Sequence, residues 1–135
     1  MAREAYFLQF ASDIAKVSDV PIMLTGGIRR RQVLEQVMKS GVAVAGIATA
    51  LALHPDLPNA LLRGEDPNPQ LPPVNWWNKT LAALARMMVI KYQLNRQSEG
   101  LKPKLSVWPS WALLLGLWAG NKRAKLYRKQ MEIKK

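Results

Sequence analysis

Two consecutive glycines and three consecutive arginines, Gly26-Gly27 and Arg29 to Arg31, form the part of the sequence best suited to binding chemistry. The glycines follow a short apolar run, "PIMLT", and a glycine turn after a strand lets backbone N–H groups approach an anion. The arginines open the next predicted helix, where cations oppose the helix dipole, so a bound phosphate would supply the missing negative charge. A plain tight turn with solvated arginines accounts for the same residues, and the spacing leaves both interpretations open.

A second apolar run, "VAVAGIA" at residues 42–48, ends 21 residues after Gly27. That interval allows two successive strand ends to share one phosphate, as at the last two strands of many (β/α)8 barrels. The sequence lacks the Gly-Lys-Ser/Thr of a triphosphate-binding loop and a full G-x-G-x-x-G dinucleotide fingerprint. The pattern therefore indicates a phosphate site of the barrel type rather than one of these two.

Several kinds of chemistry are excluded by composition. The chain of 135 residues has no cysteine and a single histidine, His54. Disulfides, a thiolate nucleophile and a histidine-based metal site within one chain are thereby ruled out. No carboxylate pair and no base–nucleophile set stands out, so we predict neither a catalytic residue nor a metal site. The longest apolar stretch, residues 108–120, is shorter than the about 20 residues that a membrane-spanning helix needs.

The glycine turn needs strands and helices to position it. Apolar spacing predicts a helix over residues 3–17, and residues 30–40 follow the glycines as a second helix. The two runs without alternation, residues 21–25 and 42–48, are typical of parallel strands covered on both faces. No other segment has comparable strand character, so we expect these strands to need neighbours from a larger sheet or from a partner.

The rest of the chain is predicted to be helical. Four prolines in "EDPNPQLPPVN" exclude regular structure there. Residues 76–97 form the clearest predicted helix, with Trp77, Leu81, Leu84, Met88 and Tyr92 on one face. "SEGLKPKLSVWPS" is predicted to end it, and residues 111–135 to form a last helix, apolar first and basic later.

These residues resemble a known family. "PIMLTGGIR" and "GIATALALHPDLP" are similar to the seventh strand with its loop, and to the eighth strand with the segment after it, in the NADH:flavin oxidoreductases of the Old Yellow Enzyme family. Those enzymes are (β/α)8 barrels that bind FMN. The resemblance covers residues 3–62 well and the rest more loosely. It implies an α/β fold class: a partial TIM barrel, the last two βα units, followed by a mostly helical C-terminal extension.

On this interpretation the chain has three parts. Residues 1–63 are the C-terminal part of an FMN-binding barrel domain, residues 64–75 a Pro-rich linker, and residues 76–135 a helical extension with a basic tail. The family's first six strands are absent, and with them its catalytic residues. We therefore expect a C-terminal fragment that is inactive alone and that uses NAD(P)H only when the missing part of the barrel completes it.

The resemblance also implies the cofactor site. Gly26 and Gly27 would present N–H groups to the FMN phosphate, with Arg29 nearby, and the second loop would contribute Ala48 and Thr49. The family's usual glycine-arginine pair is Ala48-Thr49 here. A charge-assisted hydrogen bond contributes about 1.5–3 kcal/mol, so FMN affinity falls roughly ten- to a hundredfold without it. We expect FMN binding to be weak or absent in this chain alone.

The net charge of +11 admits other functions. A small basic protein that binds a membrane surface is the alternative, because Trp108, Trp111 and Trp118 flank "ALLLGL" and a cationic stretch follows. An extension helix that packs its tryptophans on the barrel would explain the same residues. No nucleic-acid module is recognised, so we predict no nucleic-acid partner. The predicted location is the cytoplasm, with membrane-surface contact through the tail.

Overall fold

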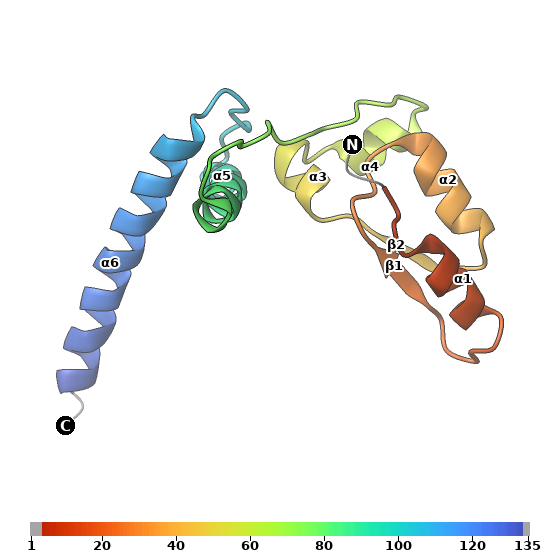
Figure 1. The fold of residues 1–135 in the computed structure, drawn as a ribbon, viewed down its shortest axis with the longest axis horizontal. Coiled ribbons are helices and arrows are strands. Elements are labelled where there is room, and N and C mark those ends of the chain that lie inside the picture. Colours follow the sequence, from red (N-terminus) through yellow and green to blue (C-terminus); the bar gives the residue numbers. More distant parts are fainter. Residues whose placement is uncertain (1–3, 134–135) are drawn as a thin grey trace. The chain divides into compact units, whose positions relative to one another are not determined.

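The computed structural model describes residues 4–133, and the chain divides into two compact units, Met1–Gln70 and Leu71–Lys135. The fold is mixed α/β, mostly helical, with two short strands in the described residues. The first unit holds both strands and four helices, and the second unit holds two long helices (Figure 1). Two strands alone do not make a barrel, so the predicted partial barrel stays a prediction.

The first unit is built on a parallel pair of strands. Its elements are α1 (Leu8–Ala15), β1 (Met23–Thr25), α2 (Arg31–Lys39), β2 (Val44–Gly46), α3 (Thr49–Leu53) and α4 (Leu57–Leu62). The strands pair in register from Met23 with Val44 to Thr25 with Gly46. Helices α1 and α2 both lie to the right of the strands in Figure 1, and the core between them contains Leu24 and Val37. The opposite face of the pair is open.

Most predicted elements of the first unit are present but shorter. Helix α1 begins at Leu8 rather than at residue 3, because Ala5 adopts a left-handed conformation with φ of 46° while its N–H donates to Gly26 O at 2.8 Å. Helix α2 ends at Lys39, and Gly41 follows it with φ of 89°, the left-handed conformation in which a glycine commonly ends a helix. Residue 3 lies outside the described residues.

The second unit is a helical hairpin of α5 (Lys79–Ser98) and α6 (Pro109–Ile133). The Asn78 side chain accepts a hydrogen bond from Leu81 N at 3.0 Å and so caps α5. A small core of Val89, Val107 and Ala112 lies where the helices meet. The predicted final helix starts two residues early, at Pro109, and residues 134–135 lie outside the described part.

The predicted buried face of α5 is wrong by one residue. Trp77 is fully exposed and precedes the helix, and Leu81 is 45% exposed. The buried positions are instead Ala82, Ala85, Val89 and Gln93. Gly116 of α6 allows a close approach of the two helices, because a Cβ there would clash with the Met88 side chain. Met88 and Tyr92 of the predicted face are partly buried and pack against the core of Val89, Val107 and Ala112.

Candidate functional site

The glycine turn after β1 has the geometry that the sequence predicts. Gly26 and Gly27 have φ values of 147° and 69°, which side chains with a Cβ rarely adopt. The ring of Tyr6 covers Gly26, because an ideal Cβ at this position would stand 3.2 Å from Tyr6 Cζ. Within the described residues, no hydrogen-bond acceptor pairs with the N–H of Gly27. This loop can therefore offer a free N–H to an anion.

The second predicted loop lies beside the first. Thr25 and Gly46 are paired, so the two strands end at the same level and their loops leave the sheet at one edge. Gly46 permits this close approach, since a Cβ there would stand 3.1 Å from Thr25 Cβ. Ala48 is the N-cap residue of α3 and Thr49 its first residue. In residues 4–133 the N–H of Thr49 also has no acceptor.

The arginines of this region are neutralised by a carboxylate that the sequence reasoning missed. Glu4 is 3% exposed and lies between two guanidinium groups, with Oε1 2.7 Å from Arg29 Nε and Oε2 3.1 Å from Arg30 Nε. The single hydrogen of Arg29 Nε is donated to Asn68 Oδ1 at 2.8 Å. The contact of Glu4 Oε1 with Arg29 is therefore an ion pair without a well-aligned hydrogen bond, and Oε1 has no hydrogen-bond partner in the described residues.

Two more carboxylates complete this charge balance. Asp66 Oδ1 accepts a hydrogen bond from Arg31 N at 2.8 Å, at the first turn of α2, where a negative charge complements the helix dipole. Glu35 Oε1 lies 2.8 Å from Arg31 Nε. Each of the three arginines thus has an acidic partner. The argument that a phosphate must supply the missing negative charge therefore no longer holds, and the phosphate prediction rests on the glycine geometry and on the resemblance.

Arg29 is accordingly part of a structural network. Its side chain, 21% exposed, links the segment at Glu4 to the glycine turn and to Asn68. Whether its remaining N–H groups contact a cofactor phosphate is not tested by these contacts, so the binding role of Arg29 stays a prediction. No pattern in the sequence pointed to Glu4 or Asp66, because both act on residues more than twenty positions away along the chain.

A groove of the first unit lies beside β2. It has a volume of about 850 Å³ and is bordered by α2, β2 and α4, and its apolar lining includes Leu34, Met38, Ala45 and Leu61. Gly26, Gly27 and Thr49 do not border this groove, although Ile47, which precedes Ala48, does.

The described residues contain no cluster of three His, Cys, Asp or Glu side chains that could hold a metal ion. His54 is the C-cap residue of α3, and its Nδ1 is buried without a hydrogen-bond partner in residues 4–133. A search of the described helices for one long and apolar enough to cross a membrane found none.

Comparison with known proteins points to one class. Part of the chain is similar to a flavin oxidoreductase that depends on NADH. That protein is the NADH-dependent flavin oxidoreductase iliE of Hypocrea jecorina (strain QM6a), with 43% identity over 61 residues. The match covers 44% of this chain and 15% of iliE. No family model and no solved structure matches the chain.

Proposed function

We propose that the first unit forms the last two βα units of an FMN-binding barrel of the Old Yellow Enzyme type, within an NADH-dependent flavin oxidoreductase. The observation that carries this proposal is the 43% identity to iliE over 61 residues. The parallel strands and the two loops that leave the sheet at one edge agree with this arrangement. The remaining strands would come from polypeptide outside these 135 residues.

The open surfaces of the first unit support completion by other strands. A parallel pair has a free edge on each strand, and parallel sheets are stable when both faces are covered. Met23 and Val44 are paired on the open face, 63% and 49% exposed. Because full burial of such side chains contributes about 1.5–3 kcal/mol each, covering the exposed parts adds roughly 2 kcal/mol. The face therefore favours contact with the interior side chains of further strands.

In the proposed enzyme this chain holds the phosphate end of FMN. The N–H groups of Gly27 and Thr49 would donate to phosphate oxygens, with Gly26 and Ala48 shaping the two loops. Bound FMN supplies hydride transfer between NAD(P)H and an acceptor. This chain contributes orientation of the cofactor, and the groups that contact the acceptor belong to the proposed remainder of the barrel.

The test is a chimera of the two proteins. The segment of iliE that matches this chain is replaced by the matching residues of this chain, and the purified protein is analysed for bound FMN and for NADH oxidation. We expect a folded flavoprotein that binds FMN more tightly than riboflavin, which lacks the phosphate. A chimera that folds, judged by circular dichroism, yet binds FMN and riboflavin equally would overturn the assignment of the phosphate loops.

Two variants of the chimera sharpen this test. Thr49→Arg restores the family's arginine and should raise FMN affinity roughly ten- to a hundredfold. Gly27→Val should abolish the preference for FMN over riboflavin, because valine resists the φ of 69° and alters the N–H direction. Gly41→Val is the matched control, since Gly41 also has a positive φ, of 89°, lies outside both loops, and a Cβ there would meet Ala15 Cβ at an ordinary 3.8 Å.

A further inference from the structure

The excess positive charge belongs entirely to one unit. Residues 1–70 contain seven Lys or Arg and seven Asp or Glu, so their formal charges cancel. Residues 71–135 contain thirteen Lys or Arg and two Asp or Glu, so the whole net charge of +11 lies there. All ion pairs of the described residues lie between Glu4 and Glu65. The cations of the second unit are thus available to an external anionic partner.

Helix α6 exposes large apolar side chains. Ala112 is 1% exposed and packs in the core where α5 and α6 meet. By contrast Trp111, Leu114 and Trp118, of which Trp118 also borders a groove that residues of α5 line, are 56%, 60% and 66% exposed. They recur at intervals of three and four residues, so they form one stripe along the helix. These turns span about 10 Å of helix axis.

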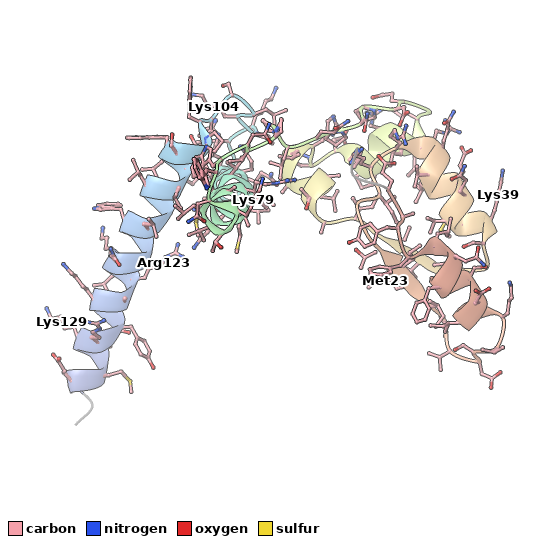
Figure 2. The ribbon with its side chains drawn as sticks, in the orientation of Figure 1. Met23, Lys39, Lys79, Lys104, Arg123 and Lys129 are labelled. Carbon is pink, nitrogen blue, oxygen red and sulfur yellow. The ribbon has the colours of Figure 1, made fainter. Side chains whose placement is uncertain are left out.

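The same stripe continues as cations. Lys122, Lys125 and Lys129 follow Trp118 at intervals of four, three and four residues, and all three are exposed. Lys122 Nζ lies 5.5 Å from the centre of the Trp118 ring. Lys129 projects from the end of the helix that extends past α5 (Figure 2). We call the six residues Trp111, Leu114, Trp118, Lys122, Lys125 and Lys129 the α6 stripe.

We propose that the α6 stripe binds the surface of an anionic lipid bilayer. Tryptophan is favoured at the boundary of headgroups and acyl chains, and exposed leucine gains by leaving water there. Lysines one to three turns further along attract headgroup phosphates and carboxylates. If the helix lies tilted with its N-terminal turns deeper, its apolar stretch would contact the acyl chains and its cations the headgroups.

A single-stranded nucleic acid is the competing partner, because bases also stack on exposed tryptophan beside cations. The leucine between the two tryptophans favours lipid, since it offers a base neither a ring to stack on nor a hydrogen bond. The proposal is independent of flavin binding, which concerns the first unit.

The test is flotation of the full chain with phosphatidylcholine vesicles, with and without phosphatidylserine, followed by tryptophan fluorescence. We expect binding to the vesicles that contain phosphatidylserine, a blue shift of emission, and weakening at high salt. The triple variant Lys122→Gln, Lys125→Gln, Lys129→Gln should lose roughly a hundredfold in partitioning, taking about fivefold for each of the three lysines. Trp118→Ala should also weaken binding.

The matched control removes three lysines of the same unit that lie off the α6 stripe: Lys79→Gln, Lys102→Gln, Lys104→Gln. This variant carries the same change of net charge but leaves the α6 stripe intact, so it should retain most of the binding to vesicles. Equal loss in both triple variants would overturn the proposal, because the attraction would then be general to the unit. Binding equal with and without phosphatidylserine, or displacement from vesicles by an oligonucleotide that binds more tightly, would overturn it as well.

Discussion

Gln93 provides the sharpest test of how the second unit is held together. This side chain is fully buried, its Nε2 donates to Lys104 O at 3.0 Å, and its Oε1 accepts from Lys104 N at 2.8 Å. One amide group thus satisfies both peptide groups of a residue in the connection between α5 and α6. Gln93→Leu keeps approximately the same volume and removes both hydrogen bonds.

The expected cost follows from these contacts. Each hydrogen bond contributes about 0.5–1.5 kcal/mol net, and a buried group left unpaired costs about 1–3 kcal/mol. Lys104 is exposed, so water reaches part of its backbone. This access lowers the cost of leaving its peptide groups unpaired. We therefore expect Gln93→Leu to reduce the free energy of unfolding of the second unit by about 2 kcal/mol.

Urea unfolding followed by tryptophan fluorescence measures this change selectively, because all five tryptophans lie in the second unit. With a urea m-value near the low end for small proteins, about 1 kcal/mol/M, the midpoint should fall by about 2 M. Gln130→Leu is the control, since Gln130 is an exposed residue of α6 and its replacement should change stability by less than about 0.5 kcal/mol. If the two variants have the same midpoint, the bonds to Lys104 contribute nothing net and our account of the connection is refuted.

Three further predictions use the same structural detail. Gly120→Ala should raise the free energy of unfolding of the second unit by about 1 kcal/mol in the same urea assay, because nothing lies within 4 Å of a Cβ at Gly120. Gly116→Ala should be destabilising relative to it, because a Cβ at Gly116 meets Met88. Equal gains in both variants would contradict the close helix contact. Arg63→Met should raise the pKa of Glu65, which a hydrogen bond from Arg63 holds below its ordinary value, and a carbon-detected NMR titration measures it. The small stabilisation from the Arg63–Glu65 pair is present above about pH 4.3 and is lost as the pH falls through the lowered pKa. An unchanged pKa of Glu65 in the variant would exclude the hydrogen bond in solution. Glu4→Gln should leave the guanidinium groups of Arg29 and Arg30 without their anionic partner. The expected loss of stability of the first unit is about 1–2 kcal/mol, a figure reduced because both arginines are partly exposed. Amide hydrogen exchange of residues 23–31 measures this loss, and unchanged protection would be evidence against the network.

Features with a local cause could be predicted from the sequence. The turn at Gly26-Gly27 was predicted correctly because its backbone demands glycine, whatever surrounds it. The two strands were found from unbroken apolar runs, although each is only three residues long. These predictions needed only a few neighbouring residues, and the structure confirms them.

Features that depend on distant residues could not be predicted. Asp66 caps a helix 35 positions earlier in the chain, and Glu4 neutralises arginines 25 and 26 positions later. The sequence therefore showed unbalanced arginines where the structure has balanced ones. The apolar face of α5 was misplaced by one residue because the largest apolar residues were assumed to be central, whereas Ala82, Ala85 and Val89 are the buried ones.

Proline has a second role that the sequence prediction did not use. Pro109 was placed in a segment predicted to end a helix, yet it is the first residue of α6, and Pro58 stands in the first turn of α4. At these positions the missing N–H would have no intrahelical partner in any case, so proline starts a helix rather than ending one. Helices α3 and α4 were not predicted; α4 has this proline in its first turn, whereas α3 is formed by alanine and leucine without one.

The uncovered edges of β1 and β2 have a consequence for folding itself. If their neighbours come from another molecule, folding of the first unit is a binding equilibrium and its midpoint depends on concentration. A partner present at a hundred times its dissociation constant would add about 2.7 kcal/mol to the apparent stability. The second unit has its own core of Val89, Val107 and Ala112, so it would melt at a temperature that dilution leaves unchanged. Two transitions that separate on dilution would be the signature of such a protein.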